Sequence, residues 1–329
     1  MQKLVLIDGN AILHRAFHAL PPLTNKKGIV VNAVYGFFSM FLKILEDQKP
    51  DYIIVCFDRP KPTFRKELFV GYQAKRPAMA SDLSPQFKLV HEVLEAAKVE
   101  IFEVDGYEAD DLIGTISVQA ISASHVARRN KSAKSEQRNA NSEELEVMIV
   151  SGDRDLLQLV NHRVKMIAPV TGLTNMIIYD NAKVIEKFGI KPSQMVDYKA
   201  LVGDASDNYP GVAGVGPKTA ASLLNEYESL DKIYKNLEKI KAKSPNLALK
   251  LAEGAESAGL AQKLAGIVLD APISLDIKKA SIKYFDKEGL KKEFEKMGFK
   301  SLLKRISAKP EIVNEAKPRK SENKQMELL

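Results

Sequence analysis

The sequence predicts an α/β fold: a mostly parallel sheet flanked by helices, followed by a largely helical C-terminal region. Four short apolar runs have the length and composition of buried strands: Lys3 to Ile7, Tyr52 to Phe57, Glu100 to Val104 and Val147 to Val150. Segments with apolar side chains at helical spacing separate them, and such alternation is typical of parallel sheets. From Asp197 to about Ile306 the spacing is helical almost throughout, apart from Gly203 to Pro217.

Length and composition limit the class of protein. The chain has 329 residues, which predicts about two domains, and 45% of its residues are hydrophobic, enough for a full core. It contains no apolar run long enough to span a bilayer and no signal-peptide pattern, so we expect a cytoplasmic protein with no membrane partner. The single cysteine, Cys56, lies in the second apolar run and indicates a packed core thiol.

The first half of the chain should contain three helices between its strands. Asn32 is expected to cap a helix from Ala33 to Glu46. Ser84 and Pro85 are expected to open a second helix that runs to about Ala97, as its cap and first-turn residue. A third helix follows the third strand, from Leu112 to Ala120.

The later elements are shorter. The polar stretch from Ser122 to Glu146 is expected to be a disordered or partly helical surface insertion. After the fourth strand we expect a short helix, two short strands, and helices around Lys183 and Met195. The last helix should end near Ile306, and the polar remainder with Pro310 and Pro318 is expected to be a flexible tail.

Acidic residues follow all four predicted strands. They are Asp8, Asp58, the group Glu108, Asp110 and Asp111, and the pair Asp153 and Asp155. Because ligand sites in such sheets form at the carboxyl ends of the strands, we expect these carboxylates to converge. Carboxylates held so close repel one another unless a cation joins them, and oxygen ligands suit a hard ion such as Mg²⁺. The sequence therefore predicts a metal site rather than solvated acids.

A second acidic motif lies beside a glycine-rich hairpin. Asp204 and Asp207 are three residues apart, which places them on one side of a turn or helix. Directly after them the run from Pro210 to Ala220 carries Gly211, Gly214 and Gly216, then Lys218 and Thr219. This spacing is not a phosphate-binding P-loop, because Pro217 stands where that motif needs lysine. It better fits a helix–hairpin–helix that holds a DNA backbone without reading bases.

The stretch from Arg59 to Arg76 is basic and carries aromatic residues, which is typical of a surface that follows a phosphate backbone and stacks on unpaired bases. Tyr72, Lys75 and Arg76 are its candidate DNA contacts. The net charge of +7 fits a nucleic-acid partner, although a soluble lysine-rich protein would also have it. The five histidines form no ligand pair or triad, so we expect structural roles for them.

The motifs together resemble the 5′ nuclease domain of bacterial DNA polymerase I, a member of the flap endonuclease superfamily. The resemblance covers residues 1 to about 306. In family order the matching motifs are Leu6-Ile7-Asp8-Gly9-Asn10, Val55-Cys56-Phe57-Asp58, Gly106-Tyr107-Glu108-Ala109-Asp110-Asp111, Gly152-Asp153-Arg154-Asp155, Gly203-Asp204-Ala205-Ser206-Asp207-Asn208 and the hairpin from Gly211 to Ala220.

The resemblance implies a PIN-like catalytic domain over residues 1–180, with a helical arch at 59–82 and a flexible insertion at 122–146. It implies a helical DNA-binding region over 181–306, with the helix–hairpin–helix at 209–227, and a flexible tail at 307–329. The implied reaction is two-metal hydrolysis of DNA phosphodiesters by a 5′→3′ exonuclease or flap endonuclease in replication and repair.

The resemblance also assigns roles to the acids. Asp8, Asp58, Glu108, Asp110 and Asp111 would hold one Mg²⁺; Asp153, Asp155, Asp204 and Asp207 would serve the second, some of them through water. Mn²⁺ is expected to substitute for Mg²⁺. Arg65 matches the arch arginine that neutralises the scissile phosphate. A K⁺ ion is implied at the hairpin, near Gly211 to Gly216.

Three departures from the family pattern stand out. Gln73 follows Tyr72 where the family arch has lysine, which puts phosphate steering in doubt unless Lys66 or Lys75 substitutes. The insertion at 122–146 is longer than usual. The chain also ends where a polymerase I would continue, so it is either a free-standing nuclease or part of a longer protein, and the sequence does not decide between them. For a free-standing nuclease, a polymerase acting in trans is a candidate partner.

The tail suggests one more partner. Gln325 to Leu329 resembles the peptide that binds the bacterial sliding clamp, with leucine in place of its terminal phenylalanine. Two rival functions remain at this point. A PIN-type ribonuclease would share the metal chemistry but usually lacks both hairpin and arch. A non-catalytic junction-binding protein would have lost some of the nine acids, and all nine are present.

Overall fold

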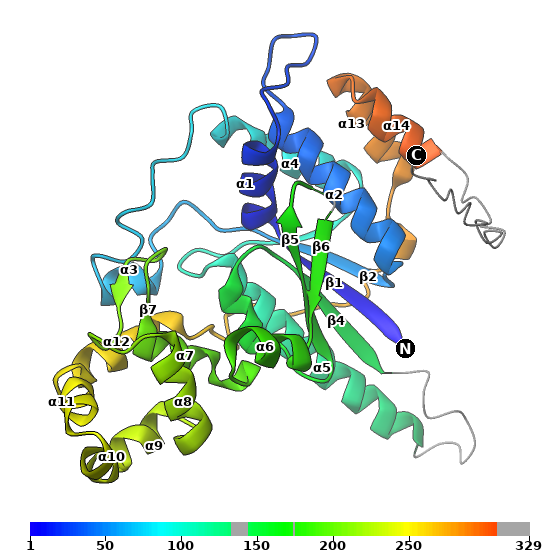
Figure 1. Ribbon diagram of the computed structural model, residues 1–329. Coiled ribbons are helices and arrows are strands. Elements are labelled where there is room, and N and C mark those ends of the chain that lie inside the picture. The colour runs from blue at the N-terminus through cyan, green and yellow to red at the C-terminus, as the bar shows by residue number, and fades with distance from the viewer. Residues whose placement is uncertain (133–143, 174, 308–329) are drawn as a thin grey trace, which may run out of the picture.

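A twisted six-stranded sheet lies at the centre of the molecule, between two layers of helices (Figure 1). The computed structural model describes residues 1–132, 144–173 and 175–307. Within them the strand order is β3-β2-β1-β4-β5-β6. The strands are β1 Gln2–Asp8, β2 Tyr52–Cys56, β3 Glu100–Phe102, β4 Leu145–Val150, β5 Val164–Thr171 and β6 Asn175–Tyr179.

The sheet is mostly parallel, as the sequence predicts. β1 pairs in parallel with β2 and β4, β2 pairs with β3, and β4 pairs with β5. Only β6 runs antiparallel, against β5. All four predicted strands are present, and their carboxyl ends meet at one edge of the sheet.

Alternate residues of the central strands face two separate cores. Leu4 and Leu6 pack on one side, against α5 (Ala109–Ser132), whereas Val5 and Ile7 pack on the other, against the aromatic cluster of α2 (Asn32–Gln48). The helices of the α2 layer also include α1 Gly9–Ala19, α4 Ser84–Ala96, α13 Lys287–Met297 and α14 Lys300–Ser307. Both sides of the sheet are therefore covered, which is why its strands read as continuous apolar runs.

The start of α2 differs from the prediction that Asn32 caps it. The helix begins at Asn32 itself, whose amide donates to the Phe17 and Leu20 carbonyls. The first amides of α2 are instead satisfied by Gln86 of α4, whose Oε1 accepts from Ala33 and Val34. A buried glutamine 53 residues away in sequence supplies this cap, so the residues next to the helix start could not predict it.

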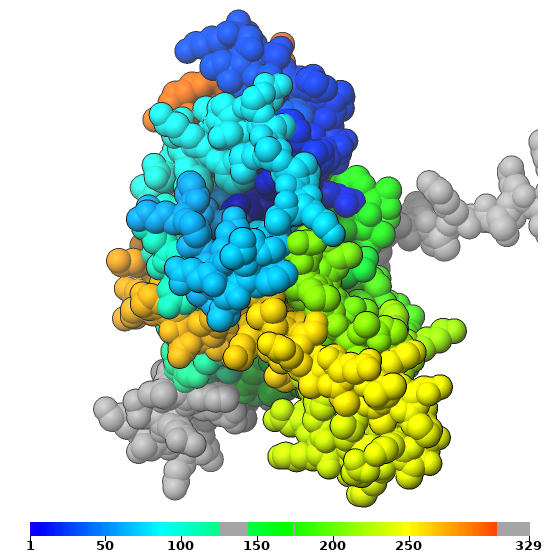
Figure 2. All heavy atoms as spheres, turned by 90° about the vertical axis from the view of Figure 1, so that its left-hand side faces the viewer, coloured from blue at the N-terminus to red at the C-terminus, as the bar shows by residue number. Residues whose placement is uncertain are grey.

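The expected arch segment contains one short helix, α3 Phe64–Leu68, and otherwise consists of turns and irregular chain. Figure 2 shows this segment, light blue to cyan, crossing the face of the molecule above the yellow C-terminal helices, with dark blue N-terminal residues visible in the hollow beside it.

The C-terminal half is mainly helical. It includes α6 Asn181–Phe188, α7 Met195–Val202, α8 Pro217–Tyr227, α9 Leu230–Lys235, α10 Leu237–Lys243, α11 Pro245–Glu253 and α12 Ala255–Ala265, with the short 3₁₀ helices Pro192–Gln194 and Ile282–Tyr284. Another 3₁₀ helix, Arg154–Leu159, lies earlier in the chain, between β4 and β5. A two-stranded hairpin, β7 Gly203–Asp204 with β8 Tyr209–Pro210, joins α7 to the turn before α8.

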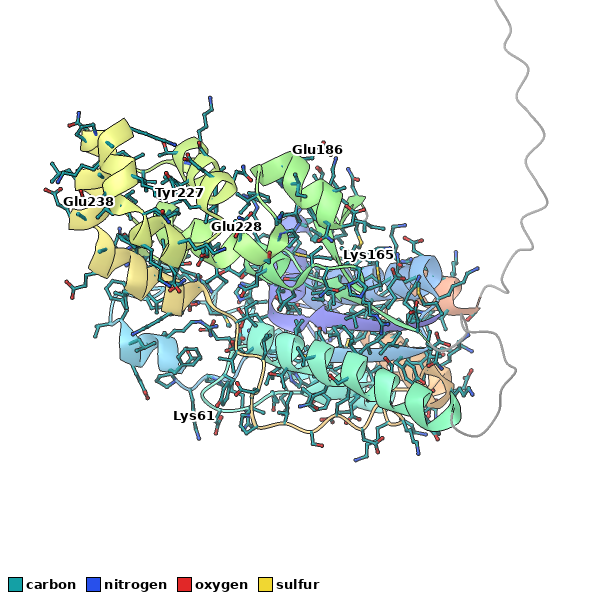
Figure 3. All side chains as sticks on the ribbon, turned by 90° about the horizontal axis from the view of Figure 1, so that it is seen from below. Lys61, Lys165, Glu186, Tyr227, Glu228 and Glu238 are labelled. Atoms are coloured by element: carbon teal, nitrogen blue, oxygen red, sulfur yellow. The ribbon has the colours of Figure 1, made fainter. Side chains whose placement is uncertain are left out.

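Residues 266 to 281 are not helical, contrary to the prediction of helix throughout this region. The segment runs along α5 instead (Figure 3), where two side chains of α5 hold it by hydrogen bonds. Thr115 Oγ1 accepts from the Ala271 amide, and Gln119 bonds both the Ile273 carbonyl and the Leu275 amide. Side chains of α5 therefore replace the hydrogen bonds that a helix would have made within the segment.

Two predicted segments lie partly or wholly outside the described residues. Residues 122–132 of the expected insertion continue α5, and β4 begins at Leu145, but 133–143 are not described. The tail from residue 308 onward, with the clamp-like peptide, is also outside them. Among the described helices, none is long and apolar enough to cross a membrane.

Candidate active site

The acids predicted from the sequence converge on one cleft at the carboxyl edge of the sheet. The cleft has a volume of about 1780 Å³. Eight of the nine predicted acids line it: Asp8, Asp58, Glu108, Asp110, Asp153, Asp155, Asp204 and Asp207. Asp111 does not. Because β1, β2 and β4 are adjacent and parallel, the acids that follow them meet even though they are far apart in sequence.

Asp8 is fixed as the N-cap of α1. Its Oδ1 accepts from the Ala11 amide at 2.9 Å, and its Oδ2 accepts from Ser151 Oγ at 2.7 Å. Burial, followed by the nearby charge of Asp58, raises the pKa of Asp8 to about 7. Asp58 accepts from the Ala109 amide at 2.6 Å, and burial raises its pKa too.

Glu108 and Asp110 stand at the N-terminus of α5. The Glu108 carboxylate accepts from Thr63 Oγ1 at 3.0 Å and from the Tyr72 hydroxyl at 3.1 Å. Asp110 Oδ1 is buried and has no hydrogen-bond partner among the described residues. Burial raises the pKa of Asp110 well above its usual range. An unpaired carboxylate oxygen in such a place is costly unless a ligand completes it.

Asp153 follows β4 and caps the 3₁₀ helix that starts at Arg154. Its Oδ1 accepts from the Asp155 amide, while its own amide donates to Ser151 Oγ, both at 2.9 Å. Ser151 therefore joins Asp153 to Asp8. Burial raises the pKa of Asp153, against the lowering effect of Lys199.

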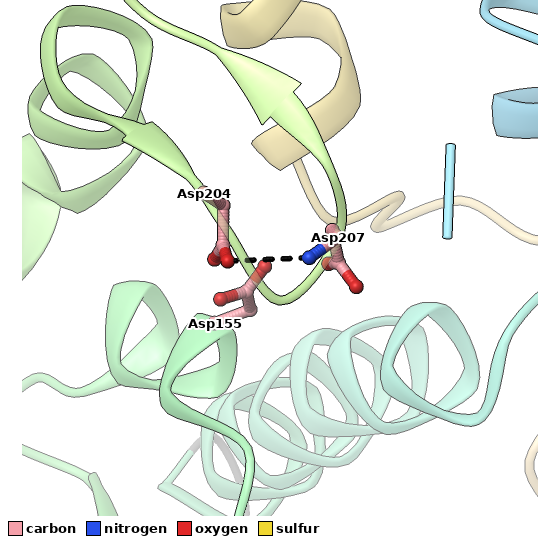
Figure 4. Close-up of side chains that lie close together, drawn as sticks. All are labelled: Asp155, Asp204 and Asp207. Carbon is pink, nitrogen blue, oxygen red and sulfur yellow. Dashed lines mark hydrogen bonds between the residues drawn. The ribbon is translucent and has the colours of Figure 1, made fainter. Parts of the chain in front are cut away.

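Asp155, Asp204 and Asp207 form a second group, shown in Figure 4, in which one oxygen from each lies within 4.8 Å of the others. The Asp207 amide donates to Asp204 Oδ1 at 3.3 Å. Lys199 of α7 contacts both Asp155 and Asp204, the latter at 2.5 Å, and Arg76 pairs with Asp207 at 2.5 Å.

These cations change the electrostatics of the second group. Although burial opposes ionisation, Lys199 holds the pKa of Asp204 at about 2. For Asp207 burial outweighs Arg76, and its pKa is raised. Sequence reasoning did not identify Lys199. Its only local signal is a position five residues before Asp204, near the end of a predicted helix.

Arg65 and Asp111 are buried together, 1% and 0% exposed, away from the cleft. Both Arg65 terminal nitrogens donate to Asp111 at 2.8 Å, and Arg65 also reaches Glu108 and the carbonyls of Leu264 and Gly266. Asp111 accepts further from the Val268 amide. Neither side chain is free here, so the expected roles in phosphate neutralisation and metal binding do not fit this conformation.

The candidate DNA contacts of the arch segment divide into two kinds. Tyr72 is buried, with its ring stacked on Tyr209 at a centroid distance of 6.5 Å, so it does not present a face to an unpaired base. Lys75 and Arg76 are exposed, and Arg76 lines the cleft. Gln73 also lines the cleft and adopts a left-handed backbone with φ of 57°.

The glycines of the predicted hairpin also differ from one another. Gly211 is pressed against Gly203, where a Cβ would lie 2.3 Å from the Gly203 nitrogen, so it serves backbone packing. Gly214, Gly216 and Lys218 are exposed, and Gly216 precedes α8 without a side-chain cap. Thr219 is half-buried.

The donor set fits divalent metal ions. Eight carboxylates line one cleft, and Asp110 presents a buried oxygen with no partner among the described residues. Carboxylate oxygens are the ligands that Mg²⁺ and Mn²⁺ prefer. The residues placed to hold such ions are Asp8, Asp58, Glu108, Asp110, Asp153, Asp155, Asp204 and Asp207.

Two family models match the sequence. The N-terminal resolvase-like domain of 5′-3′ exonucleases matches residues 3–128, and their C-terminal SAM fold matches residues 190–288. A 5′-3′ exonuclease of Aquifex aeolicus is 36% identical over 306 residues, covering 93% of this chain and 96% of the relative. DNA polymerase I of Caldicellulosiruptor bescii is 41% identical, covering 92% of this chain and 33% of the polymerase. The chain therefore spans about a third of that relative's length.

Solved structures share the fold. A bacteriophage T5 D15 flap endonuclease variant, in a pseudo-enzyme-product complex with DNA and metal ions, superposes with a TM-score of 0.60 at 19% identity, covering 93% of this chain and all of that one. The catalytic core of Rad2 in complex with DNA substrate gives 0.57 at 15% identity, with coverages of 93% and 92%. At these identities the likeness concerns the fold alone.

Proposed function

The chain belongs to the 5′-3′ exonuclease family, and from this we propose that it is a Mg²⁺-dependent, structure-specific nuclease. Its substrates would be 5′ flaps, nicks or primer ends of DNA, cut during replication and repair. The observation that carries the proposal is the convergence of eight carboxylates on one cleft, where Asp110 has a buried oxygen without a partner among the described residues.

We assign the acids to two metal positions. Asp8, Asp58, Glu108 and Asp110 would hold one ion; Asp153, Asp155, Asp204 and Asp207 would serve the other. Ions held there would lower the pKa of an attacking water and offset the charge on the leaving oxygen. Asp111 is better suited to anchoring Arg65 than to binding metal, because its oxygens already accept from Arg65 and two backbone amides.

The chain's own groups would orient the carboxylates. Ser151 donates to Asp8, the Ala109 amide donates to Asp58, and Thr63 with Tyr72 donates to Glu108. Each of these bonds leaves the acid fixed while another oxygen or lone pair stays available. The site is thereby organised before substrate arrives, which limits the cost of reorganisation during the reaction.

Positive side chains near the acids would position the phosphate. Arg76 is half exposed at the cleft and pairs with Asp207, so it could move to a phosphate once a metal ion neutralises that acid. Lys75 and Lys66 are exposed on the same segment. These residues, rather than the buried Arg65, are our candidates for steering the phosphate, which the family's arch lysine would do if Gln73 did not replace it.

The helical region would hold duplex DNA. Gly214, Gly216 and Lys218 are exposed around the start of α8, where free backbone amides suit a phosphate. The Lys250 ammonium lies 3.5 Å from the Gly214 carbonyl, so a K⁺ ion bound to that oxygen would have to displace it. We retain as proposals the division at residues 180 and 181, a polymerase partner in trans and the clamp-binding tail.

The test is cleavage of a flapped duplex labelled at its 5′ end. Release of short labelled fragments in Mg²⁺, and none in EDTA or with Asp153→Asn, would support the proposal. An equivalent RNA flap distinguishes a ribonuclease, which would cut only the RNA. Tight binding without cleavage in Mg²⁺ or Mn²⁺ would instead favour a junction-binding protein.

A further inference from the structure

One wall of the cleft is apolar and aromatic and has no part in the chemistry described so far. It is formed by Ile177 and Tyr179 of β6, Phe188 at the end of α6 and Tyr198 of α7, all of which line the cleft. We call these four residues the aromatic pocket. Figure 1 places β6, α6 and α7 side by side, and Tyr198 precedes the Lys199 that contacts Asp155 and Asp204.

The rings of the pocket are arranged to receive a flat partner. Phe188 and Tyr198 meet edge to face, with centroids 6.3 Å apart and an interplanar angle of 73°. Both are half-buried, whereas Val184 and Met195 on the same helices are fully buried behind them. The Tyr198 hydroxyl has no hydrogen-bond partner within the described part of the chain, so it can serve a ligand.

A cation stands at the edge of the pocket. Lys187 Nζ lies 4.9 Å from the centre of the Tyr179 ring and 5.6 Å from that of Phe188, and it donates to the Tyr179 hydroxyl at 2.5 Å. Its side chain is exposed and lines the cleft. The pocket therefore combines an apolar floor with one positive charge, which matches a base attached to a phosphate.

From this arrangement we infer that the aromatic pocket binds one unpaired nucleobase of the substrate strand next to the phosphate that is cut. The base would stack on the Phe188 ring and meet the Tyr198 ring at its edge, because the two rings stand at 73° to each other, and Lys187 would contact the adjoining phosphate. A paired base cannot enter, because its faces are covered by its neighbours in the duplex. The pocket would thus favour substrates whose strand end is open at the reacting phosphate.

The inference rests on the proposed function, and its test separates the two. The affinity of flapped DNA is measured in CaCl₂ without Mg²⁺, for a series of flaps that each carry one abasic site at a successive position around the junction. The series is repeated with Phe188→Leu, which keeps an apolar side chain but removes the ring. Tyr284→Leu, at an exposed tyrosine outside the cleft, is the matched control.

Stacking of one base on an aromatic side chain accounts for about tenfold in affinity. We expect the wild-type chain to bind the flap with an abasic site at one position about tenfold more weakly than it binds intact DNA. Phe188→Leu should bind that abasic flap as tightly as it binds intact DNA. Tyr284→Leu should behave as wild type. Because each variant is compared with itself on intact DNA, a general weakening of the Phe188→Leu fold cancels.

The outcomes are distinct. Coupling between one abasic position and Phe188, absent in Tyr284→Leu, supports the inference. The inference would be overturned if the wild-type chain binds the DNA but the losses of affinity caused by the abasic site and by Phe188→Leu simply add at every position. The nuclease proposal would then remain intact. Failure of the wild-type chain to bind any of the DNAs would overturn both.

Discussion

The two halves of the acidic cleft use the same residue type under opposite electrostatic conditions. At the sheet edge, Asp8, Asp58 and Asp110 form no ion pair with any described lysine or arginine, and burial raises the pKa of each. Beside the β7–β8 hairpin, Lys199 bridges Asp155 and Asp204, and the pKa of Asp204 is held at about 2.

The difference suggests how the cleft responds to metal ions. Asp8, Asp58 and Asp110 form no ion pair with a described lysine or arginine, so a divalent cation would relieve their repulsion directly. The hairpin acids already have Lys199 and Arg76, which a cation must displace. We therefore expect tighter binding at the sheet edge and weaker, DNA-assisted binding at the hairpin, where a phosphate could take up the displaced Arg76.

The largest effect should follow the loss of an unpaired sheet-edge oxygen. Asp110→Asn is expected to lower flap cleavage about 10³-fold, since it removes a metal ligand worth several kcal/mol of transition-state stabilisation. Single-turnover cleavage in Mg²⁺ measures it. Asp105→Asn is the matched control, because Asp105 is an exposed acid paired with Lys61 and Arg59. Equal activity of Asp110→Asn and wild type would remove Asp110 from the site.

Asp111 lies in a third environment, where its charge is neutralised by the buried Arg65 side chain. Arg65→Ala should destabilise the protein by about 3–5 kcal/mol, because it leaves Asp111 buried and unpaired. Urea unfolding measures this. Arg59→Ala, which breaks only exposed pairs, should cost less than about 1 kcal/mol. Similar losses for both variants would show that the Arg65 pair is not an anchor.

Replacing Lys199 tests directly whether a metal ion must displace this lysine from Asp155 and Asp204. In Lys199→Met the acids lose their competing cation, so we expect about tenfold tighter Mn²⁺ binding by the weaker site. In EDTA the variant should melt at a lower temperature than wild type. Lys235→Met changes an exposed lysine of α9 and should alter neither property. Weaker Mn²⁺ binding in Lys199→Met would contradict the competition.

The metal-free protein should lose stability as the pH rises. The pKa of Asp8 is raised from 3.8 to about 7, so between these values the folded state holds a proton that the unfolded chain releases. The free energy of unfolding therefore falls as pH increases through this window. Calorimetry in EDTA should give a melting temperature roughly 3 °C lower at pH 7.5 than at pH 5.5. The difference should shrink in Asp8→Asn, and an unchanged difference would rule out Asp8 as its source.

The smallest effect concerns the arch. Gln73→Lys restores the family residue at a cleft-lining position and should tighten DNA binding about threefold at low salt, with a salt dependence steeper by about one charge. Fluorescence anisotropy at several salt concentrations measures both. Ser81→Lys is the control, since it adds the same single charge at an exposed residue outside the cleft lining. Equal gains from both would indicate a general charge effect.

Much of the fold could be predicted because its signals are local. Continuous apolar runs identified the four parallel strands, and acids at their ends identified one edge of the sheet. The Gln86 cap of α2 and the course of residues 266–281 could not be predicted in this way. Both depend on side chains that are distant in sequence, Gln86 in one case and Thr115 with Gln119 in the other.

For the site, the residue types were predictable, but their individual environments were not. Asp110 and Asp111 are adjacent in sequence, yet one faces the cleft with an unpaired oxygen and the other is sealed against Arg65. Successive helical positions point about 100° apart, so one residue decides between the cleft and the core. The role of Lys199 could not be predicted, because a single lysine on a helix belongs to no recognisable motif.

The most direct test of the two unlike acid groups is a calorimetric titration of the DNA-free protein with Mn²⁺. Wild type should bind two ions with clearly different affinities. Asp110→Asn should abolish the tighter site and Asp204→Asn the weaker one. A single class of site, lost equally in both variants or retained in both, would contradict the account.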